Sequence, residues 1–258
     1  MPLIKNIDWV LLLTITTIVG LFYFNDLTLL AWSLLWSWIV CNCTVIILHE
    51  GLSHGQVIPK SKPIGYLLEF IAHIMVPFDA ELKKSWSIHW FHHQTWKSHV
   101  DKVQNELENN SWFRYLFCSN IKRDTRVYKI IDNIDKGKIL PSNILDQYHV
   151  MINVVFSILL ILSIGITNYF YFYVIPVRLF DFYLKYVLEY LPHHGKLTKE
   201  EESDTPWLFP ICLNGAYHVS HHKNPGKLIL GPLKYLNIQY YFIKLFYNIN
   251  TSPISKIY

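Results

Sequence analysis

The sequence predicts an all-α integral membrane protein with two transmembrane hairpins (four spans) and a histidine-rich cap on the cytosolic side. Three observations predict this class. Of the 258 residues, 52% are hydrophobic and only 16% are charged, a balance typical of membrane proteins. Long uncharged runs alternate with very short turns and long polar stretches. Most of the 13 histidines gather in those polar stretches, at repeated spacings. We expect one domain over residues 1–258.

The first predicted hairpin joins a span over residues 8–25 to a span over residues 27–48. The apolar core of the first run, residues 9–24, is just short of a bilayer crossing unless its flanks join it, whereas the second run is long enough. No small-residue cleavage site follows the first run, as it would in a signal peptide, because Asn25 and Asp26 lead directly into the second. Both ends of this hairpin therefore lie on one side of the membrane.

The second predicted hairpin joins residues 149–166 to residues 169–191, with a turn near Gly165. Pro176 is expected to disturb the returning helix, because proline cannot donate the backbone hydrogen bond that a helix interior requires.

The returning helix also carries charges at helical spacing. Arg178 can pair with Asp181, and Asp181 can pair with Lys185, at i,i+3 and i,i+4. Charges at membrane depth are costly, so these side chains face the interior of the bundle or lie near the interface.

The distribution of basic residues predicts the orientation. Nearly all Lys and Arg residues fall in the regions 49–147 and 192–258, and both hairpin turns have none. Because cytosolic loops carry the excess of basic residues, both regions are expected in the cytosol, with the active site on the cytosolic face. Within the first region, residues 64–78 are apolar but too short to span, which indicates a re-entrant or interfacial helix. A net charge of +4 is too modest for a nucleic-acid binder.

Two segments repeat one histidine pattern, in which the first histidine precedes the others by three and four residues. At about 100° per residue, such positions lie on one face of a helix. Three imidazoles can therefore point the same way in each segment, and imidazole is a common ligand of iron, copper and zinc. The segments are His89, His92 and His93, and His218, His221 and His222.

Two further clusters precede and separate these triplets. His49 and His54 form an HxxxxH pattern, which differs from the HExxH of zinc proteases because Ser53 occupies the i+4 position. On an ideal α-helix their rings would be about 140° apart, so they would bracket a site or need local unwinding. His193 and His194 end the last predicted span.

With one histidine taken from the pair 193–194, the clusters supply nine imidazoles, enough for two metals with open positions. A closed zinc site needs four ligands, and neutral nitrogen ligands suit iron, so the pattern predicts a two-iron centre. The candidate ligands are His49, His54, His89, His92, His93, one of His193 and His194, His218, His221 and His222. Candidates for orienting the rings by hydrogen bonds are Glu50, Asp101, Glu189 and Asn214. His73, His99 and His149 are expected to be non-ligands.

The order HxxxxH, HxxHH, two spans, HxxHH resembles the membrane fatty acid desaturase superfamily from about His49 to Pro225. The resemblance implies four spans and a cytosolic centre of two Fe ions (Fe2+/Fe3+), with O2 as co-substrate. It also implies removal of hydrogen from an unactivated C–H bond, with the histidines holding both irons and no separate acid or base.

The sequence is compatible with two classes of substrate, acyl chains and carotenoids. The His49-Glu50 pair and Asp101, shortly after the triplet His89, His92 and His93, resemble acyl-chain desaturases. Leu191-Pro192-His193 and Gly215-Ala216-Tyr217-His218 resemble carotenoid ketolases, whose first histidine pattern is usually one residue shorter. We favour a fatty-acyl chain, with a carotenoid ketolase or hydroxylase as the alternative. The Leu-Pro-His match favours His193 as the ninth ligand.

The resemblance also implies partners. The substrate would be a lipid or acyl chain in the bilayer, and electrons would come from a separate donor of the ferredoxin or cytochrome b5 type, since we identify neither a fused cytochrome domain nor a dinucleotide-binding Gly-rich loop. A remote alternative is a membrane metal-binding or transport protein, which predicts polar residues at mid-depth in the spans. The first three spans have almost none.

Overall fold

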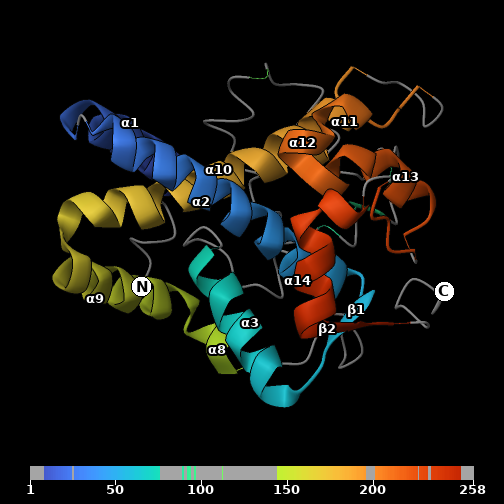
Figure 1. Cartoon of the computed structure of the whole chain (residues 1–258), viewed down its shortest axis with the longest axis horizontal. Helices are drawn as coiled ribbons and strands as arrows, with labels where there is room; N and C mark the ends of the chain where they lie inside the picture. Colours follow the sequence, from blue (N-terminus) through green and yellow to red (C-terminus); the bar gives the residue numbers. More distant parts are fainter. Residues whose placement is uncertain are drawn as a thin grey trace.

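The computed structural model is mostly helical (Figure 1). It describes residues 9–24, 26–75, 89, 92, 93, 96, 112, 144–195, 201–225, 227–231 and 234–250. Two helical stretches, Leu27–Ser53 and His149–His193, are long and apolar enough to cross a membrane by length and composition, and the second is bent at Gly165. A helical fold with long apolar helices is therefore confirmed.

Helices α1 (Trp9–Tyr23) and α2 (Leu27–Val45) occupy the first predicted hairpin. Asp26 caps α2, because its carboxylate accepts a hydrogen bond of 2.9 Å from the backbone N–H of Leu29. The helix does not end at residue 48 as expected. It continues as the π-helix η2 (Ile46–Ser53).

The second predicted hairpin begins with α9 (His149–Tyr169). Gly165 has φ 79° and ψ 162°, a backbone conformation that glycine adopts far more readily than other residues. The chain reverses there (Figure 1). Contacts across the reversal pair the two arms, since the Phe156 and Tyr173 ring centroids are 5.4 Å apart. The predicted turn near Gly165 is confirmed.

The returning arm runs without interruption to His193. It consists of η3 (Phe170–Val174), α10 (Ile175–Tyr183), η4 (Leu184–Tyr190) and α11 (Leu191–His193). The expected disturbance near Pro176 is the π-helical turn η3 that immediately precedes α10.

Small and polar side chains let α2 and the returning arm approach closely. Ser33 donates to the backbone carbonyl of Tyr171, and the Cys41 Sγ lies 3.1 Å from the carbonyl of Pro176. Small residues at such an interface are typical of helices that pack in membranes. On the first hairpin, a Cβ at Gly20 would collide with the Phe170 ring, which shows how closely α1 approaches η3.

The charged residues of α10 face the interior. Arg178 and Asp181 are buried and ion-paired, and the Lys185 Nζ lies 3.4 Å from the Asp181 carboxylate. The sequence allowed these charges to lie in the interior of the bundle or near the membrane interface, and in the structure they lie in the interior. Pairing offsets the large cost of desolvating these charges.

The remaining elements cover the ends of the two hairpins. Helix α3 falls within the segment expected to be interfacial, and its buried face includes Leu68 and Ala72. The strands β1 and β2 form a two-stranded antiparallel sheet that the sequence did not predict. The bounds are β1 Val57–Pro59, α3 Lys62–Met75, α8 Ile144–Gln147, η5 Pro206–Leu208, α12 Phe209–Cys212, η6 Leu213–Tyr217, α13 His218–Lys223, η7 Lys234–Leu236, α14 Ile238–Phe246 and β2 Tyr247–Ile249.

The core is tightly packed around Gly215 in η6, the turn that leads into α13. A Cβ at Gly215 would collide with the Tyr183 hydroxyl and would approach Leu188 Cδ2 to 3.3 Å. Tyr183 is fixed in place because its hydroxyl donates to the carbonyl of Cys212 at 2.8 Å.

We therefore expect Gly215→Ala to lower the free energy of unfolding by about 1–3 kcal/mol, as overpacking does in dense cores. The measurement is thermal unfolding in detergent, with Gly65→Ala as the matched control, because a Cβ there meets only Pro59 at an ordinary 3.6 Å. Tyr183→Phe should restore part of the loss in the double variant. Equal melting temperatures for both alanine variants would contradict this packing.

Candidate metal centre

The change from α- to π-helix brings the first two histidines together. In η2 the backbone N–H of His54 donates to the carbonyl of His49 at 3.1 Å, an i→i+5 bond that defines a π-turn. One π-turn therefore separates the two residues, and their ring centroids lie 4.8 Å apart. The sequence allowed two arrangements of this pair, rings on either side of a site or local unwinding of the helix. The structure has the local unwinding.

The second cluster contributes three histidines in helical conformation. His89 and His93 lie one turn apart, with their Nε2 atoms at 3.0 Å, as the spacing predicted. His92 points to a different set of partners, and its ring centroid lies 5.1 Å from that of His193.

The third cluster forms helix α13, where His218, His221 and His222 are all buried. The Nε2 atoms of His218 and His222 are 2.7 Å apart. The Nε2 atom of His221 lies 2.9 Å from that of His54, although 167 residues separate them in the chain. The first and last histidine clusters thus meet.

The neighbours His193 and His194 are placed differently. The His193 side chain is fully buried, and its ring centroid lies 4.8 Å from that of His222. His194 is half-buried and stacks on Tyr190 with centroids 4.3 Å apart. Of the pair, His193 is the one that joins the other histidines.

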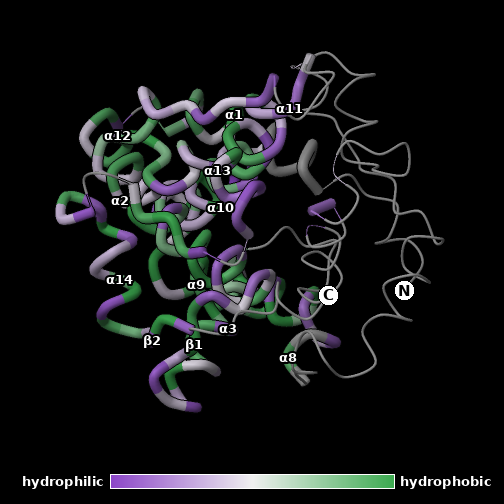
Figure 2. Tube along the Cα trace, turned by 90° about the vertical axis from the view of Figure 1, so that its right-hand side faces the viewer, coloured by the Kyte–Doolittle hydropathy of each residue, from purple (hydrophilic) through white to green (hydrophobic). Residues whose placement is uncertain are grey.

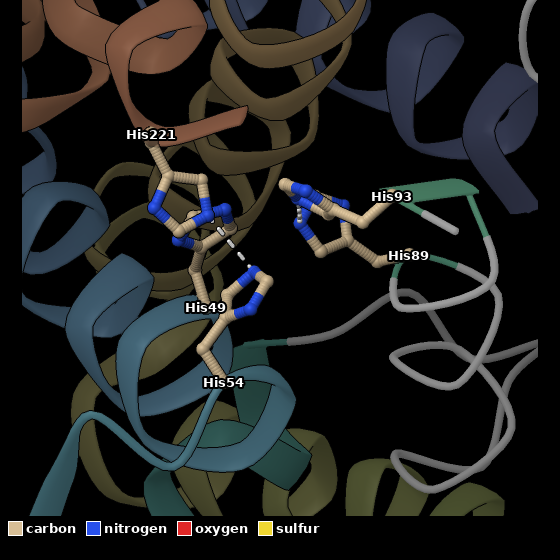
Figure 3. Close-up of side chains that lie close together, drawn as sticks. All are labelled: His49, His54, His89, His93 and His221. Atoms are coloured by element: carbon tan, nitrogen blue, oxygen red, sulfur yellow. Dashed lines mark hydrogen bonds between the residues drawn. The ribbon is translucent and has the colours of Figure 1, made fainter. Parts of the chain in front are cut away.

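These side chains form two adjoining groups. In each, one potential ligand atom per residue lies within 4.8 Å of the others. Figure 3 shows the first group, with the rings gathered from three separate segments of the chain. The groups are His49, His54, His89, His93 and His221, and His92, His193 and His222. His218 lies between the groups, with ring centroids 5.9 Å from His49 and 4.4 Å from His222.

Two buried carboxylates orient rings in both parts of the site. The Nδ1–H of His49 donates to Glu50 at 2.9 Å, and the Nδ1–H of His193 donates to Glu202 at 2.8 Å. Such bonds fix the tautomer and turn the Nε2 lone pair toward a metal. Glu50 was expected in this role. Glu202 was missed, since it lies in a charged stretch nine residues after His193 and nothing in that stretch marks it.

The pKa values suit ligation of a cation. Burial first, and then the neighbouring imidazoles, hold the pKa of these rings well below the usual range of histidine. The affected residues are His54, His89, His93, His218, His221 and His222. At neutral pH these rings are uncharged, and each therefore keeps a nitrogen lone pair available for a metal.

The spacing of the nitrogens also fits a metal. Two ligand nitrogens about 2.1 Å from one ion, at right angles around it, are about 3.0 Å apart. The three pairs of Nε2 atoms lie at 2.7, 2.9 and 3.0 Å. The Nε2 atom of His49 is buried with no hydrogen-bond partner among the described residues. Buried polar atoms are rarely left unpaired, and a bound cation would satisfy this one.

The other polar residues that the sequence singled out have different roles. His73 and His149 pair with each other at 3.3 Å, away from the cluster, as expected for non-ligands. Asn214 contacts Gln239 and Asn237 and orients no ring through them. Glu189 is half-buried in η4. His99 and Asp101 lie outside the described residues.

A family comparison now identifies the fold and its histidines. The sequence model of the fatty acid desaturase family matches residues 26–228, which contain every described histidine. The chain belongs to the fatty acid desaturase family. It is therefore a desaturase-like oxidoreductase of lipid metabolism, and its two long apolar helical stretches fit a membrane protein. Comparisons with curated proteins and with solved structures gave no match.

The Glu202–His193 bond provides a direct test of the predicted ligand set. We expect Glu202→Gln to weaken iron binding about 10- to 100-fold, because losing the charge lowers the basicity of the His193 ring. The measurement is iron retention during titration with a chelator. Glu201→Gln is the matched control, since Glu201 is exposed.

Melting temperatures of the iron-free variants separate this effect from a general loss of structure. If Glu202→Gln keeps the iron affinity of the wild type, the bond does not support a metal ligand.

Proposed function

We propose that the protein is an O2-dependent di-iron oxidoreductase of lipids, and specifically a fatty-acyl desaturase that introduces a C=C bond. The observation that supports this most strongly is the convergence of buried and half-buried imidazoles from four separate parts of the chain into two adjoining groups. Family membership supports the lipid substrate.

In this proposal nine histidines hold two irons. They are His49, His54, His89, His92, His93, His193, His218, His221 and His222. The irons, as Fe2+/Fe3+, would supply the activation of O2 that removal of hydrogen from an unactivated C–H bond requires. The chain's own contribution is to keep the imidazoles neutral and to aim them. Glu50 and Glu202 aim His49 and His193 through their Nδ1–H groups.

The overall reaction needs a partner. Desaturation takes two hydrogen atoms from the acyl chain, and two electrons with two protons complete the reduction of O2 to two waters. A separate donor of the ferredoxin or cytochrome b5 type would supply the electrons. The basic residues of the cytosolic regions suit an acidic donor.

We further propose four membrane spans, over residues 8–25, 27–48, 149–166 and 169–191, in one domain of residues 1–258. The regions 49–147 and 192–258 would lie on the cytosolic side. The length of α2 supports this arrangement. His49 lies 22 residues after Leu27, about 33 Å along the helix, slightly more than the roughly 30 Å thickness of the hydrocarbon core. The histidines would then lie at the membrane surface.

The alternative within the family is a carotenoid ketolase or hydroxylase. Two sequence matches favour it, Leu191-Pro192-His193 and Gly215-Ala216-Tyr217-His218. Both acyl desaturation and carotenoid oxidation begin with attack on a C–H bond, so the position of the substrate determines the product.

Lipid profiling of expressing cells tests the proposal. We expect new double bonds in acyl chains with the wild type, none with His193→Ala, and most of the wild-type yield with His194→Ala. The adjacent variants form a matched pair, because His193 joins the cluster whereas His194 stacks on Tyr190.

The same profiling in carotenoid-producing cells separates the two substrates. Oxidised carotenoids with unchanged acyl chains would contradict the desaturase proposal and support a ketolase or hydroxylase. Equal products from both alanine variants would contradict the role of His193.

A further inference from the structure

The segment Pro206–Tyr217, which we call the pre-histidine segment, leads directly into the third histidine cluster. We propose that this segment and α14 are inserted into the cytosolic leaflet of the bilayer beside α2, instead of standing above the membrane. The inference rests on the proposed membrane topology. The proposed topology places the whole region 192–258 on the cytosolic side. The inference goes further, because it places part of that region among lipid acyl chains.

The contact with α2 gives the depth. The backbone carbonyl of Ile211 accepts hydrogen bonds from Trp38 Nε1 at 2.9 Å and from Asn42 Nδ2 at 3.3 Å. Trp38 and Asn42 lie 11 and 15 residues after Leu27, which is about 17 and 23 Å along the helix. The hydrocarbon core is about 30 Å thick, so this contact falls below its cytosolic boundary.

Helix α14 meets α2 at the same level. Gln239, in its first turn, is fully buried and donates through Nε2 to the backbone carbonyl of Asn42 at 2.7 Å. The Oε1 atom of Gln239 accepts from the backbone N–H of Asn214 at 3.0 Å. One amide side chain therefore joins α2, α14 and the pre-histidine segment. Figure 2 shows α12, α2 and α14 along one edge of the molecule.

The irregular backbone of the pre-histidine segment is satisfied by protein groups. Besides the Ile211 carbonyl, the Cys212 carbonyl accepts from the Tyr183 hydroxyl at 2.8 Å, and the Ala216 carbonyl accepts from the Thr205 N–H at 2.8 Å. Non-helical backbone is tolerated at membrane depth only where the protein itself pairs its polar groups. These pairings meet that condition.

Several large apolar side chains of the same elements are exposed, beside the exposed Lys234 and Lys244. The pre-histidine segment contains no charged residue. Trp207 is 70% exposed and Ile211 60%. On α14 and the turn before it, Leu236, Tyr241 and Leu245 are exposed as well. Trp32 and Trp36 are also exposed on α2, the predicted span that hydrogen-bonds to the segment through Trp38 and Asn42.

A lipid bilayer is the occupant that fits this surface. The segment hydrogen-bonds to a proposed span, and tryptophan is enriched at the level where acyl chains meet headgroups. Because the segment ends immediately before His218, the histidine cluster would border the acyl-chain region, and substrate would reach it sideways from the leaflet.

Depth-dependent quenching tests the insertion in the full chain reconstituted into phosphatidylcholine vesicles. Single cysteines labelled with an environment-sensitive fluorophore are placed by Ile211→Cys, by Lys227→Cys as an exposed control on the same side, and by Phe22→Cys in a proposed span. The native cysteines are replaced by serine in a background that retains bound iron.

We expect the Ile211→Cys label to show blue-shifted emission, quenching by nitroxide-bearing lipids and no quenching by iodide. The label at Lys227→Cys should show the reverse. Iodide quenching at Ile211→Cys together with lipid quenching at Phe22→Cys would overturn the insertion while the proposed spans stand. Iodide quenching at both positions would overturn the spans and, with them, the insertion.

Discussion

The structure depends on one constraint: many neutral imidazoles are buried at distances that suit a shared cation. Three pairs of Nε2 atoms lie between 2.7 and 3.0 Å apart: two pairs join histidines one helical turn apart, and the third joins His54 to His221, 167 residues away in the chain. Burial disfavours protonation of these rings, so positive charge at this place comes at least cost from a metal bound to the lone pairs. The two hairpins, the carboxylates of Glu50 and Glu202, and the change from α- to π-helix at η2 all position these nitrogens.

The sequence predicted a helical fold with long apolar helices and the reversal near Gly165, because long apolar runs and glycine positions are local signals. The i, i+3, i+4 triplets predicted which rings share a helix face, and Gly165 marked the reversal of the second hairpin. The triplet spacing could not show that His92 would separate from His89 and His93. That separation depends on His193 and His222, which are distant in the chain.

Other features could not be predicted because they depend on tertiary contacts. The spacing of His49 and His54 was compatible with two geometries, and only the i→i+5 bond of η2 decides between them. Glu202 becomes a partner of His193 only after the chain has folded back across nine residues. The sheet of β1 and β2 pairs two three-residue strands, which are too short to give a periodic signal.

Metal analysis of the purified protein tests the central claim most directly. Iron is measured per chain by elemental analysis, beside zinc and copper, in protein purified without chelators and shown to be folded. The account predicts close to two irons per chain in the wild type and a clear loss in His92→Ala, because neutral imidazoles with open positions suit iron. One zinc per chain, or folded protein that holds no metal, would contradict it.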